Sequence, residues 1–327
     1  MAGVEIKKVE VDESGMRLDR WFKAHYPGLG FGHLQKLLRS GQIRIDGRRV
    51  KADTRLLMGQ VVRIPPLPVN DMGSLPVTDK TLRGQDDEVI LKKMLLYEDP
   101  KIFVFNKPAG LAVQGGSGLT RHVDSMLRVW RNKKGEKPRL VHRLDRETSG
   151  VLIVARSRGA AQALTTAFRT RETKKTYWAL VRGVPKKKQD KISTWMVKDI
   201  STQVDKMRVC EHGEPDSYHA VSYYRVVDTR GRALSWLEME PYTGRTHQLR
   251  VHAAHTDHPI IGDAKYFFSD SNWTLPGGIQ NRLHLHARRI RIPHPSGGIL
   301  DIVAPLPPHM VQSFNLLAFD EHEGETE

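Results

Sequence analysis

The first fifth of the chain combines helical and strand-like patterns of apolar residues. Apolar residues at the spacing i, i+3, i+4, typical of one face of a short helix, occur twice, as Leu18, Trp21, Phe22 and as Leu34, Leu37, Leu38. Ser40-Gly41 can end the second helix. Alternation at residues 43–45, the hairpin signal Asp46-Gly47 and the apolar run at 61–64 then predict short strands. Residues 16–66 are therefore predicted to form a small α/β domain.

From about residue 90 onward, short apolar runs rich in branched and aromatic residues alternate with a few helical patterns. The runs predict strands at KIFVF (101–105), VLIVA (151–155), YWALV (177–181) and AVSYYRVV (220–227). Helical spacing marks residues 123–130 and 161–168. Several strands with interspersed helices favour an α+β fold built on a mostly antiparallel mixed sheet. We assign this larger domain to residues 91–312.

Two segments lack these patterns. Residues 67–90 are polar, contain prolines and glycines and include the acidic cluster Asp86, Asp87, Glu88, which predicts a linker. Residues 313–327 are assigned as an acidic tail. From Asp320 this tail is poor in apolar residues, and we expect it to be disordered.

Composition limits the classes of protein to consider. The 327 residues suffice for about two domains with cores of their own. A hydrophobic content of 39% beside 27% charged residues is typical of a folded, soluble chain. The single cysteine, Cys210, excludes a disulfide framework and a cysteine-based zinc finger, and it suits a reducing compartment such as the cytoplasm. No apolar run approaches the roughly 20 residues of a membrane helix.

The charge is strongly basic and unevenly distributed. Lys and Arg number 52 against 37 Asp and Glu, a formal net charge of +15. Residues 17–64 hold eleven of the basic residues and three acidic ones, a net charge of +8. A solvated surface would explain any one of these side chains, but the cluster predicts binding to phosphates. Nucleic acid is therefore the first partner to expect, and a membrane is not expected.

The segment LVHRLDRETSG (140–150) is the strongest candidate for chemistry. It places His142, Arg143, Asp145 and Arg146 in one polar turn between apolar flanks, which suggests side chains aimed into a cleft. A carboxylate among arginines stays ionised, as a nucleophile or electrostatic stabiliser must. The alternative is that Asp145 only pairs locally or caps a turn, which would be the usual role of a lone aspartate in a loop.

A second polar segment, TGRTHQLRVHAAH (243–255), carries Arg245 and Arg250 among several histidines. The histidines invite a metal interpretation. However, no H-E-x-x-H pattern occurs and the cysteine is isolated, so no metal site is expected. Core packing is the ordinary role for Leu249 and Val251.

Two weaker signals complete the set. The glycines of NKPAGLAVQGGSG (106–118) permit a close approach of backbone to a ligand, and Lys107 could meet a phosphate. A loop shaped by its proline and glycines would explain this segment equally well. Tyr177 lies in a basic predicted strand, KKTYWALVRG, where a core role is the alternative.

Taken together, HRLDRETSG, NKPAGLAVQ, KKTYWALVRG and GRTHQLRVH, followed by HPIIGD, look like the RluA-type pseudouridine synthases in order and spacing. The resemblance covers about residues 95–305. It implies isomerisation of uridine to pseudouridine within RNA, a reaction that calls for no metal, redox carrier or nucleotide cofactor. The segment after HPIIGD, DAKYFFSDSN, is less glycine-rich than the family pattern, which concerns substrate contacts.

The resemblance also implies roles for individual residues. Asp145 would be the catalytic carboxylate, either attacking the sugar or removing a proton, and Arg245 would pair with it. Tyr177 would stack on the flipped uracil and Leu249 would line the base pocket. Arg143 would fill the gap left in the RNA, which offsets part of the cost of flipping.

The basic N-terminal domain, with two helices, a turn and an I-x-I-D-G hairpin, resembles the S-four-type RNA-binding domain over residues 16–66. That resemblance implies RNA contact through the second helix and the hairpin, with Arg39, Arg44 and Arg48 as candidates. Such a domain in front of the catalytic segment resembles the ribosomal-RNA branch of the family. We expect a monomer acting on large-subunit ribosomal RNA or its precursor particle.

Three alternatives remain open from the sequence. The chain could modify transfer RNA, or it could be a non-catalytic RNA-binding factor in ribosome assembly, for which the basic domain would suffice. A hydrolase cleaving a glycosidic bond is the third, but such enzymes normally use two cooperating carboxylates and only Asp145 stands out here.

Overall fold

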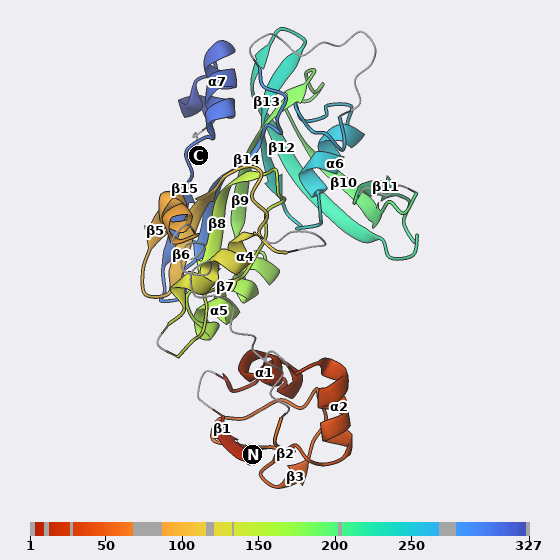
Figure 1. Cartoon of the computed structure of the whole chain (residues 1–327). Coiled ribbons are helices and arrows are strands. Elements are labelled where there is room, and N and C mark those ends of the chain that lie inside the picture. The colour runs from red at the N-terminus through yellow and green to blue at the C-terminus, as the bar shows by residue number, and fades with distance from the viewer. Residues whose placement is uncertain are drawn as a thin grey trace. The chain divides into compact units, whose positions relative to one another are not determined.

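The chain divides into two compact units, Met1–Arg83 and Gly84–Glu327 (Figure 1). The computed structural model describes residues 4–9, 13–26, 29–67, 87–115, 121–132, 134–201, 205–267 and 279–324. Across these ranges, the helices are too short or too polar to cross a bilayer.

The smaller unit contains the two predicted helices and the predicted strands. Its four-stranded antiparallel sheet has the order β1-β4-β2-β3. Asp46 and Gly47 both have positive φ, 49° and 74°, which is the geometry of the tight turn that joins two strands of a hairpin. The elements are β1 (Glu5–Lys8), α1 (Leu18–His25), α2 (Phe31–Arg39), β2 (Arg44–Ile45), β3 (Arg48–Arg49) and β4 (Val61–Ile64).

A single apolar cluster holds this unit together, because the helices turn the residues of their i, i+3, i+4 stripes onto the sheet. Trp21 and Phe22 of α1 and Leu34 of α2 are buried against Ile43 and Val62. The arginines point the other way. Arg39, Arg44 and Arg48 are exposed, so the basic charge of this unit lies on its surface.

The larger unit is built on one eleven-stranded sheet with the order β11-β10-β12-β13-β9-β14-β8-β6-β5, to which β15 adds at β14 and β7 at β8. Only the short β14–β8 pairing is parallel among the described strands. The predicted α+β fold on a mostly antiparallel mixed sheet is thus confirmed. The strands and helices are β5 (Leu95–Glu98), β6 (Ile102–Lys107), α4 (Val123–Met126), η2 (Leu127–Trp130), β7 (Arg139–Leu140), β8 (Ser149–Ala155), α5 (Arg158–Arg169), β9 (Lys174–Arg182), β10 (Gln189–Lys198), β11 (Met207–Cys210), β12 (Tyr218–Arg230), β13 (Leu234–Pro241), α6 (Gln248–His255), β14 (Leu285–Pro293), β15 (Ile299–Val303), α7 (Pro308–Leu316) and η3 (Glu321–Gly324).

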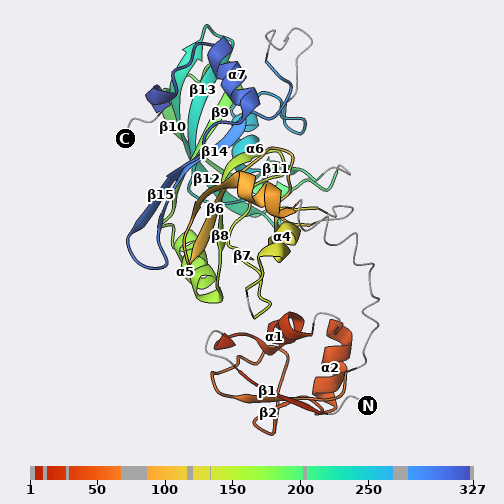
Figure 2. The same ribbon diagram turned by 60° about the vertical axis from the view of Figure 1, so that its left-hand side comes forward.

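Strand β9 shows how the sheet serves two cores at once. Successive side chains of a strand point to opposite faces. Trp178 packs with Trp236 and with Phe314 of α7 on one face, whereas Tyr177 and Ala179 face α6 on the other. The two helices therefore cover opposite faces of the central strands (Figure 1). A third core lies where α5 packs on β6 and β8 (Figure 2).

The predicted boundary at residue 312 is wrong, as is the predicted disorder for residues 320–324; residues 325–327 lie outside the described part of the chain. Helix α7 runs to Leu316, and Phe319, with 7% of its surface exposed, packs against Trp236. The 3-10 helix η3 follows, and Glu321 forms an ion pair with Arg288 at 3.2 Å. Phe314 and Phe319, with Leu317, pack this segment into the apolar cluster that contains Trp178 and Trp236.

The predicted linker is too long at its C-terminal end. Residues 68–86 lie outside the described part of the chain, but residues 87–94 form a helix. Leu91 is fully buried, and Asp87 forms an ion pair with Arg121 at 2.7 Å. Asp87 and Glu88 belong to a helix of the larger unit.

The burial of three histidines is expected to make the protein less stable in mild acid. His252, His284 and His286 have no exposed surface, and burial lowers the pKa values to about 4, about 4 and about 3. Below pH 6.5 these histidines become protonated in the unfolded chain but stay neutral in the folded chain. The free energy of unfolding that they contribute at neutral pH is therefore lost as the pH falls. Each histidine contributes up to about 1.4 kcal/mol per pH unit in this range.

We expect urea unfolding to show a falling free energy between pH 7 and pH 5. This window lies above the range in which carboxylates titrate. His286→Gln should reduce the slope by about one proton, and an unfolding free energy that stays constant over this window would contradict the prediction.

Candidate active site

The loop 141–148, between β7 and β8, carries Asp145 and is fixed at several points. Leu144 is buried, and the backbone N–H of Thr148 donates to the carbonyl of Asp145 at 3.2 Å. His142 Nε2 accepts a hydrogen bond from the backbone N–H of Ile153 at 2.8 Å, and burial lowers the pKa of His142 to about 3. These anchors hold the Asp145 side chain, 19% exposed, at the edge of a cavity.

Lys107 is one of these anchors, and the prediction that it meets a phosphate is wrong. Its side chain is fully buried, and its ammonium donates to the carbonyls of Pro108, Leu111 and Arg146 at 2.8–3.1 Å. All three ammonium hydrogens are therefore used. Burial lowers the pKa of Lys107 to about 7, while the charges of Glu147 and Asp145 act in the opposite direction. Lys107 ties the glycine-containing loop to the Asp145 loop.

The cation that pairs with Asp145 is Arg250, on α6. Its Nη1 lies 3.5 Å from Asp145 Oδ2, and its Nε and Nη2 donate to the two oxygens of Asp263 at 2.8 and 2.7 Å. Asp263 is 2% exposed and Arg250 is 4% exposed. Burial by itself would lower the pKa of Arg250, but the hydrogen bonds and charge of Asp263, with the charge of Asp145, raise it.

The predicted pairing of Arg245 with Asp145 is thereby corrected. Arg245 is exposed, its Nε donates to the carbonyl of His219 at 3.2 Å, and its guanidinium lies over the ring of Tyr218. Arg245 precedes α6, whereas Arg250 lies in its first turn. The sequence offered both arginines in one segment, but the helix that selects between them was not predicted.

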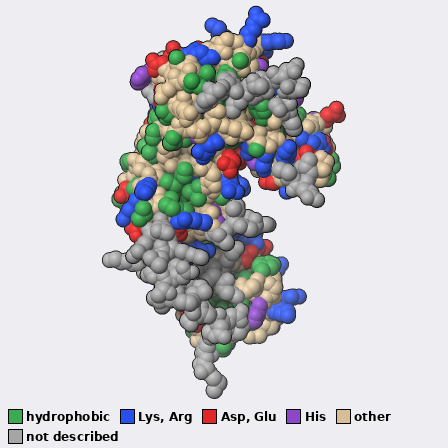
Figure 3. All heavy atoms as spheres, turned by 45° about the horizontal axis from the view of Figure 1, so that its top comes forward, with side chains coloured by type: hydrophobic (Ala, Val, Ile, Leu, Met, Phe, Trp, Pro, Cys, Tyr) green, Lys and Arg blue, Asp and Glu red, His purple; other side chains and the backbone are tan. Residues whose placement is uncertain are grey.

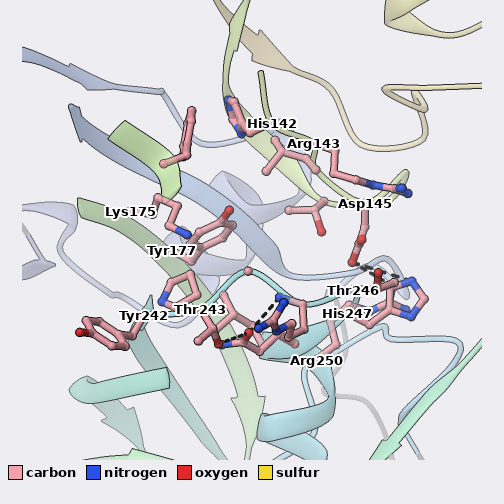
Figure 4. Close-up of a pocket in the computed structure, with 18 of the residues that line it drawn as sticks. His142, Arg143, Asp145, Lys175, Tyr177, Tyr242, Thr243, Thr246, His247 and Arg250 are labelled. Carbon is pink, nitrogen blue, oxygen red and sulfur yellow. Dashed lines mark hydrogen bonds and ion pairs between the residues drawn. The ribbon is translucent and has the colours of Figure 1, made fainter. Parts of the chain in front are cut away.

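The pocket beside Asp145 has a volume of about 570 Å³, within the usual range for a small-molecule site. Tyr177, Leu249 and Arg143 all line it. Figure 4 shows Asp145 and His247 on one side and Tyr177 with Lys175 on the other. Burial, assisted by the charge of Asp145, raises the pKa of Tyr177, so this residue presents a neutral aromatic ring and hydroxyl.

The rim of this pocket is positively charged. Asp145 is the one carboxylate among the described residues that line the pocket, whose cations are the exposed Arg143, Arg169, Arg171 and Arg245 and the more buried Lys175 and Arg250. Figure 3 shows Lys and Arg side chains on both sides of a small acidic group on the larger unit. Such a rim attracts a polyanion, while the pocket floor offers an aromatic ring and a carboxylate.

Lys175 and His247 are among the lining residues that the sequence analysis did not assign to the site. Lys175 lies two positions before Tyr177 and so on the same face of β9, which the strand period could have indicated. His247 Nε2 lies 4.0 Å from Asp145 Oδ2. It precedes Arg250 by three residues but lies just before α6 with a left-handed backbone, so no helical spacing marked it.

His252 and His258 each form hydrogen bonds with protein groups outside the pocket. His252 contacts the hydroxyls of Thr194 and Ser222 at 3.0 and 2.9 Å, and His258 contacts the carbonyl of Arg182. Throughout the described ranges, His, Cys, Asp and Glu side chains form no cluster of three or more suited to a metal ion.

Comparisons with known proteins agree with this geometry. Residues 101–255, which include Asp145, Tyr177 and Arg250, match the family model for RNA pseudouridylate synthase. The Ribosomal large subunit pseudouridine synthase C of Yersinia pestis is 35% identical over 305 residues, covering 93% of this chain and 92% of that protein. Its namesake from Escherichia coli K12 is 35% identical over 307 residues, covering 93% of each.

A solved structure is also similar. The structure of Human RNA Pseudouridylate Synthase Domain Containing 4 matches with a TM-score of 0.60 and 30% identity, covering 73% of this chain and 98% of that one. Identity above 30% over nearly the whole length, together with the same fold, shows that the chain belongs to the RNA pseudouridylate synthase family and is an RNA pseudouridine synthase.

Proposed function

We propose that this enzyme isomerises specific uridines of large-subunit ribosomal RNA, with Asp145 as the catalytic carboxylate. The relatives from Yersinia pestis and Escherichia coli carry large-subunit ribosomal names, which supports this choice of substrate over transfer RNA. Action on ribosomal RNA is consistent with the cytoplasmic location expected from the sequence, and the monomeric state stays a prediction.

The observation that carries the proposal is a single carboxylate in a cation-rimmed pocket. Asp145 is held by a fixed loop, paired with a buried arginine and set opposite an aromatic ring. A pocket of about 570 Å³ accommodates a flipped nucleoside, and the rim matches the flanking phosphates.

The reaction conserves every atom of the nucleotide. The bond between N1 of uracil and C1′ of ribose breaks, the base turns in place, and a bond forms between C5 and C1′. The proton leaves C5 and N1 gains one. Asp145 either attacks C1′ or removes a proton, and Tyr177 stacks on the base and assists removal of the C5 proton.

The remaining lining residues take binding roles. Leu249 lines the base site, and Arg143, exposed at the rim, fills the gap left in the RNA by the flipped nucleotide. Arg250 pairs with the Asp145 side chain, and Arg245 contributes positive charge at the rim.

The smaller unit anchors the RNA. Its charge of +8 over residues 17–64 and the exposed positions of Arg39, Arg44 and Arg48 along α2 and the β2–β3 hairpin support this role.

Asp145→Asn is expected to abolish pseudouridine formation while the fold and RNA affinity remain near native. The amide keeps the shape of the carboxylate but loses its charge and its basicity. The test is to measure the melting temperature, the RNA affinity and the pseudouridine yield of the variant on one transcript. Glu147→Gln, two residues away on an exposed carboxylate, is the matched control and should retain activity.

Other outcomes would point to other functions. Free uracil released from the transcript would indicate a hydrolase. RNA binding by the wild type without any pseudouridine would indicate a binding factor. A yield in Asp145→Asn within a few-fold of wild type would show that another group does the chemistry.

Arg250→Lys is expected to lower the single-turnover rate strongly, whereas Arg245→Lys, which keeps the positive charge at the rim, should leave the rate and RNA binding close to wild type. A lysine offers one point charge and cannot contact Asp263 with two bonds while reaching Asp145. Arg250→Ala would also leave Asp263 buried and unpaired, a loss of about 3–5 kcal/mol of stability. A normal single-turnover rate in a folded Arg250→Lys variant would remove Arg250 from the mechanism.

Replacing Arg39, Arg44 and Arg48 together by alanine is expected to flatten the salt dependence of RNA affinity. Each lost phosphate contact reduces the slope of log K against log salt by about 0.7 for single-stranded RNA, so three contacts amount to about 2. The matched control removes three exposed lysines of the larger unit, Lys186, Lys188 and Lys191, for the same loss of charge. Equal slopes for the two variants would contradict an anchoring role for the smaller unit.

A further inference from the structure

His247 occupies an unusual place next to Asp145. It is the residue before α6 and has a left-handed backbone with φ 55° and ψ 17°. Histidine, asparagine and aspartate are the side chains that tolerate this conformation best apart from glycine. Its ring is 8% exposed and lies between two groups, the hydroxyl of Tyr266 at 2.7 Å from Nδ1 and Oδ2 of Asp145 at 4.0 Å from Nε2.

The Tyr266 hydroxyl determines which ring nitrogen carries the proton. It accepts a hydrogen bond from the backbone N–H of Met207 at 2.8 Å. Its own proton then needs an acceptor, and His247 Nδ1 is within reach at 2.7 Å. A neutral imidazole that accepts at Nδ1 carries its hydrogen on Nε2, the nitrogen that faces Asp145.

The surrounding charges are compatible with this assignment. Burial raises the pKa of Tyr266 to about 12, so the phenol keeps its proton. Burial lowers the pKa of His247, the charge of Asp145 raises it, and those of Arg250 and Lys265 lower it while Asp205 raises it slightly. The imidazole is therefore neutral, with one hydrogen to donate.

The two partners of Asp145 approach the same oxygen. Arg250 Nη1 and His247 Nε2 lie 3.5 and 4.0 Å from Oδ2. Oδ1 forms no hydrogen bond or ion pair with the described residues, which leaves it as the oxygen that is free to act on the substrate. A distance of 4.0 Å is longer than a hydrogen bond, and contacts of this kind commonly shorten when substrate closes the site.

We propose that His247 is a positioning residue that, with its proton fixed on Nε2 by Tyr266, donates to Oδ2 of Asp145 and turns Oδ1 toward the sugar. This inference rests on the proposed catalytic role of Asp145. Holding the carboxylate in one rotamer keeps it in the reactive geometry for more of the time. We therefore expect loss of this contact to lower the turnover rate and to leave RNA affinity unchanged.

Two variants in the full-length chain separate this role from a merely structural one. The side-chain nitrogen of Gln reaches the position of His Nε2 and can donate to Asp145, but Gln offers no acceptor at the Nδ1 position. Asn has its oxygen near the Nδ1 position and can accept from Tyr266, but it cannot reach Asp145. Asn also favours the left-handed backbone, so His247→Asn should fold at least as well as His247→Gln.

The measurements are the single-turnover rate with enzyme in excess, RNA affinity and melting temperature. We expect His247→Asn to lose about 10–100-fold in rate with unchanged affinity and near-native melting, the range seen when an orienting partner is removed from a site. His247→Gln should keep the rate within a few-fold of wild type. Tyr266→Phe, which frees the imidazole to exchange tautomers, should fall between the two.

The opposite order would overturn the inference. If His247→Gln is slow and unstable while His247→Asn reacts at the wild-type rate, His247 serves only to bind Tyr266. If both react at the wild-type rate, the contact with Asp145 has no function. An inactive Asp145→Asn beside either result leaves the proposed function intact, whereas an active Asp145→Asn removes both.

Discussion

The site depends on one buried guanidinium held by two carboxylates. Removing Arg250 from water is costly, and the cost is offset by two short bonds to Asp263 and by the more distant charge of Asp145. The asymmetry matters for chemistry. Asp263 takes the strong bidentate contact, so Asp145, at 3.5 Å, faces the guanidinium without being tightly bound to it. A carboxylate in that state can still approach a substrate.

Asp263 also links the second partner of Asp145 to the first. Its Oδ1 accepts hydrogen bonds from the backbone N–H groups of Lys265 and Tyr266 at 2.9 and 3.2 Å, besides the bond from Arg250. The turn that carries Tyr266, and through it the ring of His247, is thus fixed by the same buried carboxylate. One residue, 2% exposed and outside the pocket lining, sets the positions of both groups that face Asp145.

Local patterns were enough to predict the elements with strong periodicity. The helices at Leu18–His25 and Phe31–Arg39 and the strands around residues 102–107, 151–155 and 177–181 follow directly from the spacing of their apolar residues. Helix α6 was missed because it is buried on nearly every side, including Gln248, Arg250 and His252, so no apolar stripe marks it. The order of the C-terminal segment could not be predicted because its few aromatic residues pack against tryptophans that are far away in the sequence.

The assignment of cations shows why a sequence places a catalytic pocket more readily than it assigns the roles within it. Lys107, Arg245 and Arg250 all occur in segments that resemble the family, and sequence alone treats each as a free positive charge. What each one does depends on the oxygens that the fold brings to it. Lys107 donates to three backbone carbonyls. Arg245 is exposed and donates to one carbonyl, and Arg250 contacts two carboxylates. Those oxygens come from segments up to 105 residues away, so only the folded chain determines which cation faces Asp145.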